Sequence, residues 1–146
     1  MEIRKMIETD IDALAPIMLE VFNNEIWKNI WTFPRAKAYL LDFYKNRKFV
    51  GYTAIDDNKI VGGIFGIEKV WWSSDEVSIE EFFVSPNYQG KKIGTKLLDE
   101  VIKYVKEHNF GGICLLTNKN SKAYEYYLKN GFVLNDEIVC MYKVIN

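Results

Sequence analysis

The sequence predicts a mixed α/β fold, in which one sheet of six to seven strands carries helices on both faces. Segments with the composition of strands alternate with segments whose apolar residues recur at helical spacing, and no internal repeat is present. The chain has 146 residues, 49% of them hydrophobic, and contains no linker or low-complexity tract. We therefore expect a single domain over residues 1–146 with a core of ordinary size.

Charge and apolar content argue against two classes of partner. The formal net charge is −1, so a broad surface for nucleic acid is not expected. The charged start MEIRKMIETD does not fit a signal peptide, and no apolar run approaches membrane length. Cys114 and Cys140 sit in apolar runs without metal-ligand spacing, which favours buried free thiols. A soluble, cytoplasmic protein without membrane association or a metal site is the expectation.

The first third of the chain reads as one strand followed by two helices. Residues 2–7 form the strand, and Thr9 or Asp10 is placed to cap a helix that runs to Asn23. That helix is predicted by apolar residues at helical spacing: Ile11, Leu14, Ala15, Met18, Val21 and Phe22. After the aromatic segment NNEIWKNIWTF, Pro34 suits the first turn of a second helix, with apolar positions at Ala38, Leu41 and Phe43 or Tyr44.

The remaining elements alternate more regularly. Strands over 49–56 and 59–72 flank a turn at Asp57-Asn58, and a third strand covers about 76–84. The clearest helix starts near residue 93, ends near Asn109, and carries one apolar stripe: Ile93, Leu97, Leu98, Val101, Ile102 and Val105. GICLLT reads as a strand buried on both faces. A tyrosine-rich helix over 120–130, closed by Asn130-Gly131, precedes closing strands over 132–135 and 138–145.

The stretch SPNYQGKKIGTKLL places glycine and lysine where a strand ends and a helix begins. The first amides of a helix lack internal partners, and glycine at 90 and 94 would let an anionic ligand approach them. Lys91 and Lys92 add positive charge. The phosphate-loop pattern is absent, since three residues separate the glycines and Thr95 precedes the lysine; the dinucleotide pattern is absent too. A plain solvated turn is the alternative to an anion site.

Two motifs resemble the GNAT family of N-acetyltransferases. FFVSPNYQGKKIGTKLL resembles the family's acyl-CoA-binding motif, and NSKAYEYYLKNGF resembles its second signature through Asn120, Ala123, Tyr127, Gly131 and Phe132. The order of elements is similar along the whole chain. The resemblance implies a GNAT fold with a mostly antiparallel mixed sheet, and acetyl-CoA as co-substrate.

The resemblance also implies which residues hold coenzyme A. Backbone amides of Phe83 and Val84 are expected near the thioester, and Asn120 is expected both to cap its helix and to lie near the cofactor. The loop and first helical turn are expected to hold the diphosphate: Gln89, Gly90, Lys91, Lys92, Ile93, Gly94 and Thr95. Lys92 departs from the family, which usually has glycine there.

Acetyl transfer requires a group that deprotonates the amine, because an alkylammonium has a pKa of about 10.4. Adjacent Glu80 and Glu81 face opposite sides of their strand, so at least one opens onto a cleft unless the strand is a charged edge. By likeness to polyamine acetyltransferases, we expect Glu80 to be the base and Glu81 to bind the acceptor, although the roles could be exchanged. Tyr127 is the expected proton donor to the thiolate; simple packing is its alternative.

Tryptophan-rich segments outside the motifs are candidates for acceptor binding. Trp27, Trp31, Trp71 and Trp72 could surround a cation, with Glu25 and Asp75 adding charge complementarity. Tryptophans that cap the core or form a homodimer interface are the alternative. The leading hypothesis is therefore an N-acetyltransferase that acts on a small-molecule primary amine, such as a polyamine or an aminoglycoside. Acetylation of a protein N-terminus or lysine, and a non-catalytic acyl-CoA-binding module, are the competing hypotheses.

Overall fold

The computed structural model describes residues 1–24 and 27–146, which form two compact units, Met1–Leu116 and Thr117–Asn146. The first unit holds the sheet strands β1 (Glu2–Lys5), β2 (Phe49–Asp56), β3 (Lys59–Lys69), β4 (Glu76–Val84) and β5 (Gly112–Leu115). It also holds helices α1 (Ile11–Phe22), α2 (Phe33–Tyr44) and α3 (Ile93–Glu107), and the 3-10 turns η1 (Glu8–Asp10) and η2 (Pro86–Tyr88). Within the described ranges, no helix is long and apolar enough to cross a bilayer.

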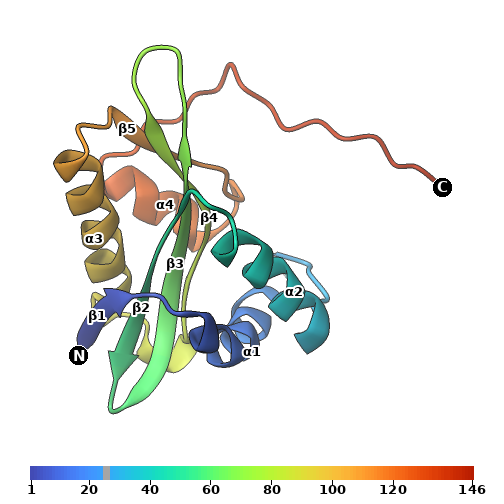
Figure 1. Cartoon of the computed structure of the whole chain (residues 1–146). Coiled ribbons are helices and arrows are strands. Elements are labelled where there is room, and N and C mark those ends of the chain that lie inside the picture. Colours follow the sequence, from blue (N-terminus) through green and yellow to red (C-terminus); the bar gives the residue numbers. More distant parts are fainter. Residues whose placement is uncertain (25–26) are drawn as a thin grey trace. The chain divides into compact units, whose positions relative to one another are not determined.

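The sheet is mixed and mostly antiparallel, as predicted. Its strand order is β1-β2-β3-β4-β5, with antiparallel pairing from β1 to β4 and parallel pairing between β4 and β5. Asp57 and Asn58 make the predicted turn between β2 and β3, both with positive φ. Helices α1 and α2 cover one face of the sheet and α3 covers the other (Figure 1). The prediction of helices on both faces is confirmed.

The core between the sheet and the first two helices fixes the register of α2. Phe65 of β3 and Phe83 of β4 are buried there together with Ala36 and Leu40 of α2. The predicted apolar position Leu41 is partly buried against this core, but the predicted apolar position Ala38 is exposed. The helix begins at Phe33 because the Thr32 side chain caps it, accepting from the Arg35 amide at 3.4 Å. Residues 36 and 40 then lie one turn apart on the buried face.

Asp10 anchors a buried polar cluster that joins β1, α1 and β2. Its side chain is nearly inaccessible and accepts hydrogen bonds from both Arg4 guanidinium nitrogens at 2.8 and 2.9 Å. It also accepts from the Ile7 amide and the Thr53 hydroxyl, each at 2.9 Å. The sequence predicts Thr9 or Asp10 as the cap of α1. Asp10 is the N-cap residue, but its side chain does not accept from the amides of that helix. It ties the first helix to the sheet instead.

The second unit contains the predicted tyrosine-rich helix, α4 (Lys122–Lys129). Its cap is Ser121, whose hydroxyl accepts from the Tyr124 amide at 3.3 Å, so the assignment of Asn120 as the cap was wrong. Gly131 has φ +86°, and the Phe132 amide donates to the Tyr127 carbonyl at 3.0 Å. This left-handed ending is the one that Asn130-Gly131 predicted.

The two closing strands predicted over 132–135 and 138–145 do not form, so the part of the chain that the structure describes has a sheet of five strands rather than six to seven. Apolar side chains of that segment, such as Val139 and Met141, are exposed. A β-strand is stabilised by hydrogen bonds to a neighbouring strand, and an alternating sequence pattern alone does not provide that neighbour. Within the described residues, β5 pairs with β4 alone, and it is half-buried rather than buried on both faces. Cys114 is likewise half-buried and Cys140 is exposed, both as free thiols.

We predict that Asp10→Asn lowers the free energy of unfolding by about 2–4 kcal/mol, because it leaves the Arg4 charge without its partner. Burial alone would raise the pKa of Asp10, but Arg4, the Ile7 amide and Thr53 together hold that pKa below its ordinary value. The carboxylate is thus stabilising above its unfolded-state pKa of about 3.9, and this contribution is lost as the pH falls through the lower folded-state pKa. The difference from wild type should therefore shrink in acid.

Urea unfolding at pH 7 and at pH 3 measures both effects. Asp12→Asn is the matched control, because Asp12 pairs with Lys37 at 2.7 Å while both side chains stay largely exposed. It should change the free energy of unfolding by less than about 1 kcal/mol. Equal losses from the two variants would contradict the role given to Asp10.

Candidate functional site

Strand β4 is paired on both sides only over its first half. Its pairing with β5 covers Glu76 to Ile79, whereas its pairing with β3 continues to Val84. On the β3 side the register shifts, because Phe65 lies opposite Glu81 and Gly66 lies opposite Ile79. Glu80 is the extra residue of this β-bulge. The second half of β4 therefore has an edge that β5 does not cover, next to a local distortion.

Hydrogen bonds at the end of β4 show which amide faces this open edge. The Gln89 side chain donates to the Val84 carbonyl at 3.0 Å, and the Ser85 amide donates to Val61 of β3 at 2.7 Å. The N–H and C=O of one strand residue point to the same side, and successive residues alternate. The Val84 amide therefore points away from β3, and the Phe83 amide points toward it. Of the two amides expected near a thioester, only that of Val84 lies on the open edge.

The loop after β4 presents a row of backbone donors. Gly90 has φ +82°, Lys92 has φ +63°, and α3 begins at Ile93 without a side-chain cap. Within the described part of the chain, the amides from Gly90 to Gly94 have no hydrogen-bond acceptor. A Cβ at position 90 would meet no atom within 4 Å, so this side of the loop is open. Uncapped amides at a helix N-terminus, with Lys91 and Lys92 beside them, fit an anionic diphosphate.

The two adjacent glutamates lie in different environments. Glu80 is exposed, and one of its oxygens accepts from the Ser78 hydroxyl at 2.9 Å. Glu81 is partly buried, and its Oε2 accepts from the Tyr39 hydroxyl of α2 at 3.2 Å. Burial raises the pKa of the Glu81 carboxyl to about 7, opposed by the Tyr39 hydrogen bond and assisted by the charge of Glu80. Glu81 is thus the carboxylate that can gain and lose a proton near neutral pH.

Aromatic rings from the α1–α2 connection and from α2 surround Tyr39. The Trp31 ring lies 4.9 Å from the Tyr39 ring between centroids, and Phe43 lies 4.7 Å from it on the other side along the helix. The Trp31 backbone is held by Asn23, whose side chain accepts from its amide at 2.7 Å and donates to its carbonyl at 2.9 Å. Trp27 packs edge-on against Phe22 at 5.0 Å. Trp31 thereby reaches the group that holds Glu81.

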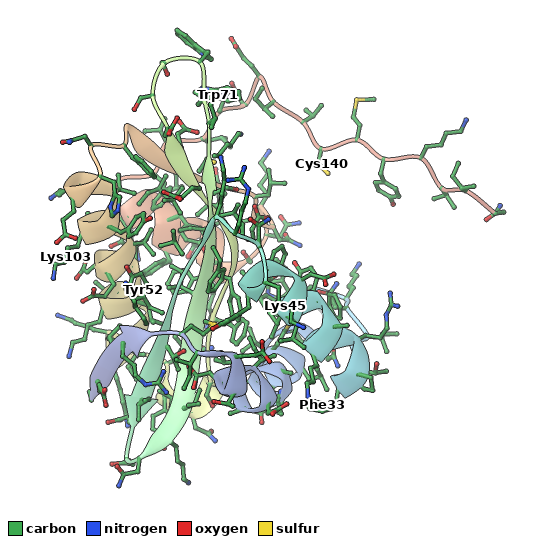
Figure 2. The ribbon with its side chains drawn as sticks, in the orientation of Figure 1. Phe33, Lys45, Tyr52, Trp71, Lys103 and Cys140 are labelled. Carbon is green, nitrogen blue, oxygen red and sulfur yellow. The ribbon has the colours of Figure 1, made fainter. Side chains whose placement is uncertain are left out.

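The structure does not bring Trp72 to this aromatic cluster. Trp71 and Trp72 lie in the loop of the β3–β4 hairpin, which extends away from α2 (Figure 2). Trp72 is 87% exposed, and the Lys69 ammonium lies over the Trp71 ring at 4.3 Å. Five residues of extended strand, roughly 17 Å, separate Glu81 from this loop. Glu25, also expected to bind the acceptor, lies outside the described residues.

The remaining predicted residues belong to the second unit. The Asn120 amide donates to the side-chain oxygen of Asn118 at 2.8 Å. The Tyr127 ring packs edge-on against Phe132 and Tyr126, with centroids 5.2 and 5.7 Å apart. Among the residues that the structure describes, no group of three or more His, Cys, Asp or Glu side chains could hold a metal ion.

Sequence reasoning missed Tyr39. The signal was present in α2, because Ala36, Leu40 and Phe43 recur at i, i+4 and i+7. Placing Ala38 and Leu41 on the apolar face put Tyr39 out of reach of the sheet. With the observed register, Tyr39 lies beside the buried positions and contacts β4.

We predict that Lys92→Gly raises the midpoint of thermal unfolding, because a residue with a Cβ costs about 1 kcal/mol in the left-handed conformation that Lys92 adopts. Lys91→Gly is the matched control, because it removes the same charge from the adjacent residue, whose φ is ordinary. There glycine only adds conformational freedom to the unfolded chain, so the midpoint should fall. Calorimetry on both variants measures the difference. Destabilisation by Lys92→Gly as large as that by Lys91→Gly would contradict the loop conformation.

Comparison with known proteins yields relatives in sequence and in structure. The acetyltransferase (GNAT) family matches residues 18–132. Streptothricin acetyltransferase A of Bacillus subtilis is 28% identical over 128 residues, which are 80% of this chain and 71% of that protein. An uncharacterized N-acetyltransferase of Methanocaldococcus jannaschii is 32% identical over 107 residues, 73% of this chain. The chain spans only 44% of the length of that archaeal relative.

Two solved structures with low identity share the fold. An aminoglycoside acetyltransferase from an uncultured soil metagenomic sample, in complex with sisomicin, has a TM-score of 0.76 at 20% identity, covering 99% of this chain and 96% of its own. A predicted acetyltransferase of Clostridium acetobutylicum with acetyl-CoA has a TM-score of 0.74 at 24% identity, covering 97% and 95%. The match over residues 18–132 extends across most of the sequence. The chain belongs to the acetyltransferase (GNAT) family.

Proposed function

We propose that the protein transfers an acetyl group from acetyl-CoA to a primary amine of a small molecule, with Glu81 as the general base. The observation that carries this proposal is the position of Glu81, a partly buried carboxylate at the bulge of β4 with a pKa of about 7. A base with a pKa near the operating pH combines a large deprotonated fraction with useful proton affinity. The roles expected for Glu80 and Glu81 are therefore exchanged in this proposal.

Coenzyme A would be held by the end of β4 and the start of α3. The amides from Gly90 to Gly94 supply the donors for the diphosphate, and Lys91 and Lys92 supply charge at the same place. We assign Thr95, the last residue of the expected set, to the same first turn. The Gln89 side chain donates to the Val84 carbonyl and so ties this loop to the end of β4. The Val84 amide, on the open edge of β4, is the donor placed for the thioester carbonyl oxygen.

The amine must lose a proton before it reacts, since its pKa of about 10.4 leaves it charged at neutral pH. Glu81 accepts that proton, directly or through a water molecule, and the freed nitrogen lone pair then forms the bond to the acetyl carbon. The carbon–sulfur bond breaks as the amide forms, and the sulfur leaves with its electron pair. The nitrogen gives up a second proton in this step, which balances the proton that the thiolate takes up. A thiolate of ordinary pKa, about 8.5, is then protonated. We assign Tyr127 as that proton donor and place Asn120 at the cofactor; both roles remain predictions.

Two lines support a small molecule as the acceptor. Relatives in sequence and in fold are named for acetylating streptothricin and aminoglycosides. The carboxylate of Glu81 lies next to Tyr39, whose ring packs against Trp31, so an ammonium group would meet negative charge beside aromatic rings. Trp27 and Trp31 therefore stay in the proposed acceptor site, and Trp72 does not.

A panel of acceptors tests the proposed function. Release of free coenzyme A from acetyl-CoA is measured with polyamines, aminoglycosides, amino acids and peptides as acceptors. Turnover with a small-molecule amine, and its absence with peptides, is the expected result. Turnover with peptides alone would favour a protein acetyltransferase. Binding of coenzyme A without turnover on any acceptor would favour a non-catalytic module.

We predict that Glu81→Gln lowers kcat by about 10²- to 10⁴-fold, because it removes the proton acceptor. Gln keeps an oxygen that can accept from Tyr39, so the thermal midpoint and the affinity for coenzyme A should stay unchanged. In the wild type, kcat/KM should rise with pH through about 7 as Glu81 loses its proton, since the raised pKa of Glu81 sets that limb. Glu80→Gln is the matched neighbour and should reduce kcat only a few-fold. The reverse ranking of the two variants would restore Glu80 as the base.

A further inference from the structure

We infer that Tyr39 is a positioning residue for this reaction: its hydroxyl holds one oxygen of Glu81 so that the other oxygen meets the amine. The inference rests on the proposed role of Glu81 as the base. Neither the family motifs nor the acid–base pair expected from the sequence includes Tyr39, which lies in α2.

The contact links two elements that are distant in sequence. The Tyr39 hydroxyl donates to Oε2 of Glu81 at 3.2 Å, across 42 positions of the chain. Within the described residues, Oε1 of Glu81 has no hydrogen-bond partner. The carboxyl group is thus held at one oxygen and open at the other. A base must present its free oxygen at hydrogen-bond distance from the proton that it removes, so fixing the first oxygen orients the second.

Tyr39 is itself held in place on two sides. Trp31 and Phe43 pack on its ring, and Asn23 fixes the Trp31 backbone through two hydrogen bonds. Ala36, one turn before Tyr39, and Leu40, the next residue, are fully buried and fix α2 on the core. The hydroxyl is therefore oriented before any ligand binds. Such a pre-organised neighbour reduces the conformational freedom that the carboxylate would otherwise lose in the reaction.

The same contact determines how Tyr39 changes the pKa of Glu81. Among the residues that the structure describes, the titratable groups that act on Glu81 are Tyr39 from α2 and Glu80 from β4 itself. A hydrogen bond donated to a carboxylate favours its charged form, and so offsets part of the effect of burial. Burial and the nearby carboxylate raise the pKa of Tyr39, so its hydroxyl stays protonated and can donate throughout the working range. Without the hydroxyl, Glu81 should take up its proton at higher pH.

The test is the pH dependence of kcat/KM in Tyr39→Phe, which keeps the ring between Trp31 and Phe43 and removes only the hydroxyl. We expect the midpoint of the acidic limb to shift to higher pH by about one unit. This shift corresponds to the low end of the free energy of a hydrogen bond to a charged group. Activity at pH 6.5 should fall by about tenfold, while KM for acetyl-CoA stays unchanged. The midpoint of the limb is independent of the folded fraction, so it can be read even if the variant is less stable.

Tyr44→Phe is the matched control. Tyr44 lies in the same helix, its ring stacks on Phe49 at 5.4 Å, and its hydroxyl has no partner in the described part of the chain. Its pH profile should match that of wild type. An unshifted limb in Tyr39→Phe, with Glu81→Gln inactive, would overturn the inference and leave the base in place. Full activity of Glu81→Gln would overturn the proposed base itself.

Discussion

The incomplete pairing of β4 is the constraint on which the candidate site depends. A strand bonded on both sides has no free backbone group and no room beside it, and β4 is in that state only as far as Ile79. Beyond that point, β3 still holds the strand, so its second half stays rigid while its other edge is open. The bulge at Glu80 adds a bend at the place where the pairing changes. The second half of β4 thus has the properties of an edge strand, held on one side and with backbone groups available on the other.

Asp10, which is buried, and Glu81, which is partly buried, show how the number of hydrogen-bond donors determines the role of a carboxylate. Asp10 accepts hydrogen bonds from Arg4, from the Ile7 amide and from Thr53, and its pKa is held low. Glu81 accepts one neutral hydrogen bond, and burial raises its pKa to about 7. The first carboxylate stays charged and stabilises the fold. The second accepts too few hydrogen bonds to stabilise its charged form fully, which lowers the stability of the fold. For the same reason its pKa is raised and it can exchange a proton.

The sequence predicted the elements whose pattern is set locally. The stripe of α3, the turn at Asp57-Asn58, the glycine ending of α4 and the loop at Gly90 follow from spacing and backbone preference within a few residues. The motifs also identified the family. A homodimer and a cytoplasmic location stay predictions.

What could not be predicted depends on contacts between distant segments. The spacing within α2 could have given its register, but the contact of Tyr39 with Glu81 joins residues 42 positions apart, which no local pattern reveals. The bulge that separates Glu80 from Glu81 is likewise a property of two strands together. The closing strands were predicted from alternation alone, which does not provide a pairing partner.

The most direct test of the account is the titration of the Glu81 side-chain carboxyl by ¹³C NMR, with the resonance assigned by comparison with Glu81→Gln. The account predicts a midpoint of about 7, because the partly buried group at the open half of β4 has a single neutral donor. A midpoint near the ordinary glutamate value of about 4.3 would contradict it. In that case Glu81 would be a solvated surface charge, and the bulge of β4 would not create a base.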